Sequence, residues 1–374
     1  MELMKNGLAQ PAVTRISHAL TKVLVNFNAQ AFESDCLQGL NELELKERVN
    51  HIISILHDYL PDEFPEAANI LIKIADVWDF GNADDSLKSF AAWPIIDYFS
   101  VYGLEHPEES LLGLKQLTHL FSSEFAIRAF IVKYPEYCHQ QFTLWVKDES
   151  EDVRRLVSEG TRPKLPWGLQ LKQFVVDPTP NLPLLTSLKS DPSLYVRRSV
   201  ANHLNDIAKD HPAVVINTCK QWSNEKTKSN AKEVDWVIKH ATRTLVKNGY
   251  AEVFSLLGFT EAPEVSIDAI VLSNQVIKLG EAVSFAMNIS STVQHAQHFV
   301  IDYAIHFVKA NGKQQAKVFK LKNVTLQPNE TIKLSKSFSF KPITTRKYYI
   351  GEHKIELLLN GKPISAKSFD LVSS

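Results

Sequence analysis

Val153-Arg154-Arg155-Leu156-Val157 recurs 43 residues later as Val196-Arg197-Arg198-Ser199-Val200. A third, weaker copy, Val237-Ile238-Lys239-His240-Ala241, begins after a further 41 residues. Apolar residues around these segments recur at the spacing of an amphipathic helix, and short clusters rich in Pro, Gly, Asp and Ser separate the helical runs. A period of roughly 40–47 residues built from helices is typical of solenoids, in which each repeat buries its apolar face against its neighbours. We therefore predict a HEAT-like α-helical repeat solenoid with a long concave surface.

The pattern changes after Pro263, where apolar and polar residues alternate and Val, Ile, Phe and Thr become frequent. Two dipeptides, Asn311-Gly312 and Asn360-Gly361, predict hairpins with type I′ turns, in which both central residues need a positive φ. About seven short strands in this region predict an antiparallel immunoglobulin-like β-sandwich. We expect strands within 265–272, 282–289, 299–309, 315–321, 331–340 and 353–359. The predicted domains are residues 1–262 and 263–374.

The composition is that of a globular protein, with 44% hydrophobic and 22% charged residues among 374. No run of about 18 uncharged apolar residues is present, and the N-terminus lacks an apolar signal core. The three cysteines, Cys36, Cys138 and Cys219, are far apart and show no Cys-x-x-Cys spacing, which disfavours both a disulfide framework and a cysteine-rich zinc site. We expect reduced, buried thiols and a protein of the bacterial cytosol or nucleoid, without a membrane contact.

The formal net charge of −1 conceals a gradient along the chain. Residues 1–110 carry a net charge of −11, residues 111–262 carry +4, and residues 263–374 carry +6. A chain whose positive charge lies outside an acidic N-terminal third can present one face to a polyanion such as nucleic acid.

The helix that carries the first copy of the repeated segment is predicted to end at Gly160, because Pro163 and Pro166 prevent it from resuming. Glu159 then lies in the last turn, where a carboxylate faces the negative end of the helix dipole at a cost of about 0.3–1 kcal/mol. A nearby positive charge should compensate.

Two interpretations of Glu159 stay open at this point. One is a structural ion pair with Arg155, which lies one turn earlier on the helix. The other is a site for a cation, formed by the carboxylate, the helix C-terminus and the ring of Trp167, which we expect to be exposed on the proline-stiffened loop.

Two further groups of polar residues allow both a structural and a functional interpretation. Arg198, Asn202 and Asp206 follow one another at intervals of four residues on the predicted helix of the second copy. They form either a solvated face or a phosphate-binding stripe that lines the concave surface. Glu124 follows two serines and is predicted to open a serine-capped helix, where an acid is favourable in any case. No metal-binding histidine motif, Gly-rich phosphate loop or Gly-x-Ser-x-Gly elbow is present, so we expect no metal and no cofactor.

Residues 158–167, Ser-Glu-Gly-Thr-Arg-Pro-Lys-Leu-Pro-Trp, followed by residues 195–206, Tyr-Val-Arg-Arg-Ser-Val-Ala-Asn-His-Leu-Asn-Asp, resemble the AlkC branch of the DNA alkylation repair glycosylases. These are HEAT-like-repeat proteins related to AlkD, and some AlkC members carry an immunoglobulin-like domain. The resemblance covers the helical part, most specifically residues 120–250. It implies excision of cationic N3-methylated bases from double-stranded DNA, chiefly 3-methyladenine and as a second candidate 3-methylcytosine, without a metal and without a deep base-flipping pocket.

The resemblance also implies roles for individual residues. Glu159 and Glu124 match the catalytic carboxylates, Trp167 is the aromatic contact to the lesion, and Arg155 and Asp206 complete the cleft. Basic and polar side chains that we expect to contact DNA are Arg162, Lys164, Arg197, Arg198, Asn202, Lys317 and Lys320. We expect a monomer without an obligate protein partner. The competing hypothesis is a non-catalytic HEAT-like scaffold that binds DNA or protein through its concave face.

Overall fold

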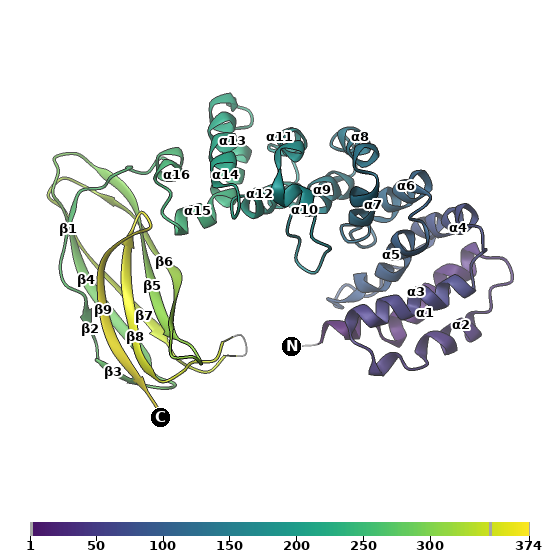
Figure 1. Ribbon diagram of the computed structural model, residues 1–374, viewed down its shortest axis with the longest axis horizontal. Coiled ribbons are helices and arrows are strands. Elements are labelled where there is room, and N and C mark those ends of the chain that lie inside the picture. Colours follow the sequence, from purple (N-terminus) through teal and green to yellow (C-terminus); the bar gives the residue numbers. More distant parts are fainter. Residues whose placement is uncertain (1–2, 344–345, 374) are drawn as a thin grey trace. The chain divides into compact units, whose positions relative to one another are not determined.

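The computed structural model describes residues 3–343 and 346–373, which form two compact units. The first unit contains the residues up to Asp210 together with Thr227–Val237, and the second contains His211–Lys226 and the residues from Ile238 on. The first unit is built of helices, and the second combines helices with the β-strands (Figure 1). Over the ranges described, every helix is too short or too polar to cross a bilayer.

The helices follow one another from residue 4 to residue 256. The α-helices in the described residues are α1 (Gln10–Val23), α2 (Ala29–Leu37), α3 (Leu45–Asp58), α4 (Phe64–Val77), α5 (Trp93–Tyr102), α6 (Pro107–Leu117), α7 (Ile127–Lys133), α8 (Pro135–Trp145), α9 (Glu151–Gly160), α10 (Lys172–Val176), α11 (Leu182–Leu188), α12 (Leu194–Ile207), α13 (Pro212–Glu225), α14 (Ala231–Ala241), α15 (Arg243–Lys247) and α16 (Ala251–Leu256). Short 3-10 helices are η1 (Met4–Leu8), η2 (Leu40–Glu42), η3 (Lys88–Ala92) and η4 (Thr179–Asn181). Proline stands in the first turn of α4, α5, α6, α8 and α13, where its fixed φ suits a helix and its missing N–H is not needed.

The first two copies of the repeated segment form equivalent helices, α9 and α12, which pack against each other. Val153 and Val157 are buried on α9, and Val196 and Val200 are buried at the matching positions of α12. The predicted HEAT-like repeat is therefore confirmed, because the repeated valines are the residues that neighbouring repeats bury against one another.

The first arginine of each copy has the same role. Arg154 donates to the backbone oxygens of residues 148 and 149 (2.8 and 2.9 Å), and Arg197 donates to those of residues 191 and 192 (2.5 and 2.9 Å). In both cases the acceptors lie six and five residues earlier, in the loop that leads into the helix. The repeated arginine thus binds carbonyl groups that the loop itself leaves without a partner.

The strands form two sheets. One sheet contains β1 (Val265–Ile267), β2 (Val271–Leu272), β4 (Ala282–Ser291) and β7 (Thr331–Ser339), and the other contains β3 (Val276–Lys278), β5 (Gln297–Val308), β6 (Gln314–Leu326), β8 (Gly351–Leu359) and β9 (Lys362–Val372). In the first sheet β4 pairs with β1, β2 and β7, and the order in the second is β3-β9-β8-β5-β6.

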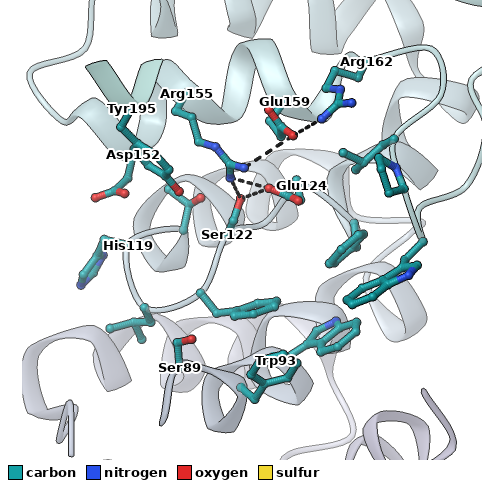
Figure 2. A pocket seen from close by; sticks show the side chains of 18 residues that line it. Ser89, Trp93, His119, Ser122, Glu124, Asp152, Arg155, Glu159, Arg162 and Tyr195 are labelled. Atoms are coloured by element: carbon teal, nitrogen blue, oxygen red, sulfur yellow. Dashed lines mark hydrogen bonds and ion pairs between the residues drawn. The ribbon is translucent and has the colours of Figure 1, made fainter. Parts of the chain in front are cut away.

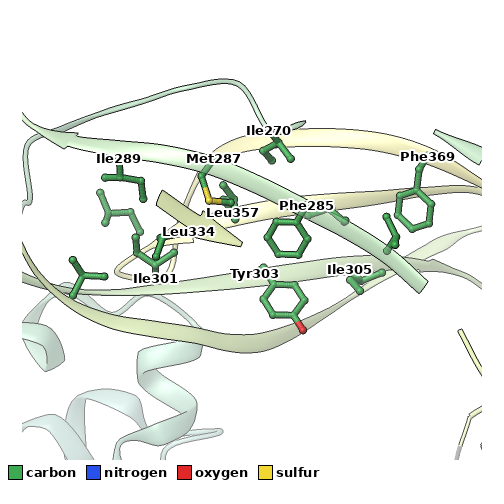
Figure 3. Close-up of a cluster of buried hydrophobic side chains, with 14 of the residues drawn as sticks. Ile270, Phe285, Met287, Ile289, Ile301, Tyr303, Ile305, Leu334, Leu357 and Phe369 are labelled. Atoms are coloured by element: carbon green, nitrogen blue, oxygen red, sulfur yellow. The ribbon is translucent and has the colours of Figure 1, made fainter. Parts of the chain in front are cut away.

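A shared apolar core joins the two sheets, as Figure 3 shows. Every second residue of β4 is buried, including Phe285 and Met287, and these side chains meet Ile301 and Tyr303 of β5. The rings of Phe285 and Tyr303 lie 5.2 Å apart between the sheets. The predicted β-sandwich is thus confirmed, since alternate residues of strands from both sheets fill one core.

Three details of the predicted sandwich are wrong. The described residues form nine strands rather than about seven, and β3 pairs with β9 in parallel, so the sandwich is not wholly antiparallel. Asn360 and Gly361 both have positive φ (45° and 73°), as a type I′ turn requires, but of the other pair only Gly312 does. Asn311 avoids the left-handed region because Gly312 N–H bonds to Lys309 O and Lys309 N–H bonds to Lys313 O, which closes a wider loop.

Helical residues of the second unit lie directly against its sheet. A Cβ placed on Gly361 would come within 2.3 Å of the Gly249 Cα, so the turn and the end of α15 can approach only because both are glycine. The backbone N–H of Thr260 also donates to His298 O at 2.7 Å. These contacts group residues 238–262 with the strands, and the predicted domain boundary between residues 262 and 263 stays a prediction.

Candidate functional site

A hollow of about 550 Å³ opens on the surface of the first unit. Charged side chains lie on the side formed by α9, and Ser89 and Trp93 lie on the opposite side (Figure 2). The lining residues are Ser89, Phe90, Trp93, Thr118, His119, Leu120, Phe121, Ser122, Glu124, Phe125, Asp152, Arg155, Glu159, Arg162, Leu165, Pro166, Trp167 and Tyr195. The lining contains three acids, two arginines and six aromatic rings. Because the acids outnumber the arginines and ring faces attract positive charge, the lining favours a cation.

Carboxylates and cations alternate along one continuous network, which we call the charge chain. Its members, in order of contact, are Glu124, Arg155, Glu159, Arg162, Asp206 and Lys209. The first four members line the hollow, whereas Asp206 and Lys209 do not. Each arginine lies between two carboxylates, and each buried carboxylate therefore keeps its charge close to a positive partner.

Glu159 is held at both carboxylate oxygens. Its Oε1 accepts from Arg162 Nη1 at 2.5 Å and lies 3.6 Å from Arg155 Nη2, and its Oε2 accepts from the Ser199 hydroxyl at 2.5 Å. Only 5% of the residue is exposed. The predicted Arg155–Glu159 pair is present, but Arg162 is the nearer cation.

Arg155 joins the two candidate carboxylates. Its Nη1 donates to Glu124 and, at 2.7 Å, to the Ser122 hydroxyl, which in turn donates to Glu124 at 2.8 Å. The guanidinium also lies 4.8 Å from the centre of the Tyr195 ring. Burial lowers the pKa of Arg155, but Glu124 and Glu159 outweigh that effect and raise it overall, so the cation is permanent.

The predicted helix start at Glu124 is wrong. Helix α7 begins at Ile127, and Glu124 lies in the turn before it. The Ser123 hydroxyl donates to Leu114 O rather than capping the helix. Glu124 is placed by Ser122 and Arg155 instead of by the helix dipole.

Gly160 ends α9, as predicted, but for another reason. It does not have the positive φ of a helix-ending glycine. A Cβ at this position would lie 2.7 Å from a methyl carbon of Ile127, so glycine is needed for close packing between α9 and α7. This packing brings the turn of Glu124 next to the last turn of α9.

The loop after α9 displays Trp167, which is 56% exposed, as expected. Trp167 has a φ of +65°, a strained conformation for a residue with a side chain. Arg128, the second residue of α7, is fully buried and donates to Leu169 O of this loop (2.5 Å) and to Gly160 O at the end of α9 (2.8 Å). No role for Arg128 was predicted from the sequence, although an arginine between Ile127 and Phe130 on an apolar face is a sign of a buried structural cation.

Aromatic rings form the wall of the hollow opposite the charge chain. Trp93 stacks on Phe121 and Phe125, with ring centres 5.2 and 5.3 Å away. The Trp93 indole N–H donates to Asp97 at 2.7 Å. Burial raises the pKa of Asp97 to about 7, although this hydrogen bond lowers it. This aromatic wall was not predicted from the sequence, because its members come from separate helices and turns.

Two predicted site residues are largely buried members of the charge chain. Asp206, expected to complete the cleft, is 2% exposed and does not line the hollow. Arg162, expected to contact DNA, is 8% exposed and binds Glu159 and Asp206, the latter through Nε at 2.8 Å and Nη2 at 2.7 Å. Its geometry fits a role in positioning Glu159.

The other polar residues predicted on the solenoid differ in exposure. Arg197 has the structural role of the repeated arginine and also lies 5.9 Å from the Trp236 ring. Lys164 pairs with Asp210 at 2.5 Å. Arg198 is exposed and Asn202 half-buried, so the predicted stripe runs from solvent at Arg198 to the interior at Asp206.

The two lysines predicted to contact DNA from the β-sandwich lie on opposite faces of their sheet. In the strand register Lys317 is opposite Ile305, whose side chain is in the core, and Lys320 is opposite Asp302 on the other face. Lys317 belongs to a group that we call the basic patch, formed by Lys309, Lys317, Arg346 and Lys347.

Within the described ranges no group of three or more His, Cys, Asp or Glu side chains is arranged to hold a metal ion. His203 lies fully buried beside the charge chain, with its Nδ1 2.9 Å from Ser158 O. Burial lowers the pKa of His203 to about 4.

The buried imidazole predicts a pH effect on stability. The folded protein keeps His203 neutral down to about pH 4, whereas the unfolded chain takes up the proton near 6.5. Stability is therefore present above about pH 6.5 and is lost as the pH falls toward 4, by about 1.4 kcal/mol per pH unit for this group. The variant His203→Gln should show a smaller acid-dependent loss, measured as the denaturation midpoint at several pH values. Identical pH profiles for the two proteins would contradict the buried neutral imidazole.

Comparisons with known proteins extend over the whole chain. Residues 266–373 match the family described as "Uncharacterised protein YhaZ, C-terminal Ig-like domain". The chain is 36% identical to the uncharacterised protein YhaZ of Bacillus subtilis over 369 residues, which are 98% of this chain and 99% of YhaZ. It is also similar to the solved structure of the Pseudomonas fluorescens alkylpurine DNA glycosylase AlkC bound to DNA containing an abasic site analog. The identity to AlkC is 33% and the TM-score 0.89, covering 99% of this chain and 100% of AlkC.

Proposed function

Since the chain belongs to the family of AlkC and YhaZ, we propose that it is a DNA glycosylase that removes alkylated bases from double-stranded DNA. The observation that carries the proposal is the pair of carboxylates, Glu124 and Glu159, held on either side of Arg155 in a hollow walled by aromatic rings. Both glutamates line the hollow of this protein, which is similar to the glycosylase AlkC over its whole length.

The charge of the hollow supports a cationic substrate. Alkylation at N3 gives adenine or cytosine a positive charge, and the hollow offers more carboxylates than cations together with electron-rich ring faces. We propose 3-methyladenine as the main substrate and 3-methylcytosine as the second. Trp167 stands exposed on its loop rather than at the end of a closed slot, which supports contact with a lesion that is not inserted into a deep pocket.

The reaction is hydrolysis of the N-glycosidic bond. The bond between the sugar C1′ and the base nitrogen breaks, its electron pair leaves with the base, and the base departs uncharged. The sugar becomes an oxocarbenium-like cation, to which water adds before losing a proton. Glu159 and Glu124 would stabilise the developing positive charge, and because they are held in place beforehand they need not reorient as it forms.

Either carboxylate could orient the water, and the hydrogen bonds favour Glu124. Both oxygens of Glu159 already accept hydrogen bonds from protein groups. Of Glu124, only Oε2 has a partner among the residues described, which leaves Oε1 to accept a hydrogen bond from water. No cofactor is needed, and we propose that the protein acts as a monomer in the cytosol or nucleoid.

The variant Glu124→Gln should slow excision measurably, by up to about tenfold. That is below the range typical of general-base catalysis, because the leaving base is already cationic and water needs little activation. Glutamine can also still orient the water through its amide oxygen. Single-turnover excision rates at several pH values measure this effect. A rate equal to that of wild type would show that Glu124 takes no part in the reaction.

The β-sandwich would add contacts to phosphates through the basic patch. Replacing Lys309, Lys317 and Lys347 by alanine should flatten the dependence of log K on log salt by about 0.9 for each phosphate that the variant no longer neutralises. Affinity for a duplex with an abasic analog, measured at several salt concentrations, gives this slope. The matched control replaces three other exposed lysines, Lys333, Lys336 and Lys367. Equal slopes for the two triple variants would mean that the basic patch does not bind DNA.

Base release tests the proposed function directly. The purified chain is incubated with methylated duplex DNA, and free bases are separated by chromatography. We expect release of 3-methyladenine and formation of abasic sites. Tight binding to methylated duplex without any base release would contradict the proposal and favour the non-catalytic scaffold.

A further inference from the structure

The second unit contains a cavity of about 350 Å³ away from the charge chain. It lies between residues 239–259 and the face of β5 and β6 that points away from the sandwich core. Three features of its lining together indicate a ligand.

The first feature is an apolar floor. Val246, Leu257, Phe259 and Val300 all line the cavity, and the Phe259 ring stacks on His298 with ring centres 4.6 Å apart. Val300 is only 5% exposed. An apolar floor of this size suits one large apolar side chain.

The second feature is a rim of positive charge. Lys239, Arg243 and Lys247 follow one another at intervals of four residues, and Lys320 faces them from β6. All four residues are exposed, and the cavity has only one acidic lining residue. The rim therefore attracts a ligand with several negative charges.

The third feature is that acidic residue, Asp302, which is 4% exposed. A hydrogen bond from the Leu321 backbone reaches its carboxylate. Its Oδ1 atom is buried and has no hydrogen-bond partner in the part of the chain that the structure describes. A buried acceptor without a partner is unfavourable, so a small rotation of the Asp302 side chain that brings Oδ1 to an N–H donor of a ligand would be stabilising.

We propose that this cavity binds an acidic peptide segment of a partner protein, with one large apolar side chain on the floor. Aspartate or glutamate side chains of the segment pair with the rim, and a backbone N–H donates to Asp302. A DNA backbone would satisfy the rim, but it offers neither an apolar side chain nor an N–H donor. The site is independent of the proposed excision reaction.

Fluorescence anisotropy with the full chain tests the proposal. The probe is a labelled peptide of five aspartates with one phenylalanine in the middle, and a second probe has alanine in place of the phenylalanine. Wild-type protein should bind the phenylalanine peptide about tenfold more tightly or better, since the ring leaves water on binding. No binding of the first probe, or equal binding of both, would overturn the proposal.

Charge reversal identifies the site. The double variant Lys239→Glu/Lys247→Glu should bind the phenylalanine peptide at least tenfold more weakly than wild type. The matched control, Lys333→Glu/Lys336→Glu, changes the same charge on exposed lysines that do not line the cavity and should bind as wild type does. Thermal unfolding of both variants verifies that they fold. Two results would indicate non-specific polyanion binding and overturn the proposal. One is an equal loss of affinity in the two variants. The other is that undamaged duplex DNA displaces the labelled peptide as effectively as unlabelled peptide does.

Discussion

Replacing Glu159 by glutamine is expected to lower the single-turnover rate of 3-methyladenine excision by a factor of about 10² to 10³. Glutamine has nearly the same shape but cannot stabilise a positive charge on the sugar. At about 1.4 kcal/mol for each tenfold change, the loss corresponds to about 3–4 kcal/mol of transition-state stabilisation. A soluble Glu159→Gln protein with the wild-type rate would show that Glu159 serves only to hold the arginines.

The charge chain makes a control necessary, because Glu159→Gln also weakens a buried network. Arg162 would lose one carboxylate but keep Asp206, so we expect a loss of about 2 kcal/mol in the free energy of unfolding. Asp206→Asn removes the other carboxylate of the same arginine at a position that does not line the hollow. It should lower stability by a similar amount and keep most of the excision rate. If Asp206→Asn lost as much activity as Glu159→Gln, the effect would come from the network and not from the charge beside the sugar.

Replacing Trp167 by alanine is expected to slow excision by about tenfold to a hundredfold, in keeping with the ~1–3 kcal/mol that an aromatic ring contributes when it contacts a base. Affinity for undamaged duplex should fall less, since we propose that the ring contacts the lesion rather than phosphates. Because the side chain is 56% exposed, stability should change little. Single-turnover rates, duplex affinity and the thermal midpoint together measure these effects.

Two further variants separate the ring from the loop. Leu169→Ala removes a side chain of the same exposed fraction, 56%, from the same loop and should leave excision unchanged. Trp167→Phe keeps an aromatic ring and should recover part of the rate. A core-like destabilisation of about 3–5 kcal/mol in Trp167→Ala would show instead that the ring is a packing anchor.

The fold could be predicted largely because its signals are local. Repeated valines on α9 and α12 and the alternation along β4 depend on residues a few positions apart. The prediction errors arose where the conformation or strand pairing depends on contacts beyond the neighbouring residues. Asn311 is kept out of the left-handed region by the hydrogen bonds of the loop around it, and β3 joins β9, which lies about ninety residues later in the chain.

In the candidate site, too, features with local sequence signals were predicted and features that depend on long-range contacts were not. Sequence placed Glu159 and Trp167 correctly at the end of a helix and on an exposed loop, because caps and prolines are local signals. It did not foresee that Arg162 and Ser199 would hold Glu159. Arg162 lies 44 residues before Asp206, and Ser199 lies 40 residues after Glu159. Both separations are close to one repeat, so the period itself was the signal that could have paired them.

The charge chain also has a mechanical consequence. It crosses from α9 and the loop after it to α12, so ion pairs as well as apolar packing join these two repeats. Sliding or tilting one repeat on the other would separate buried opposite charges, which is costly. This joint should therefore be among the stiffest in the solenoid, and duplex DNA that docks across it must supply the bending itself. If the chain excises bases as we propose, such a stiff joint would favour DNA that bends easily, and the flexibility of the base-pair steps around a lesion should influence the excision rate.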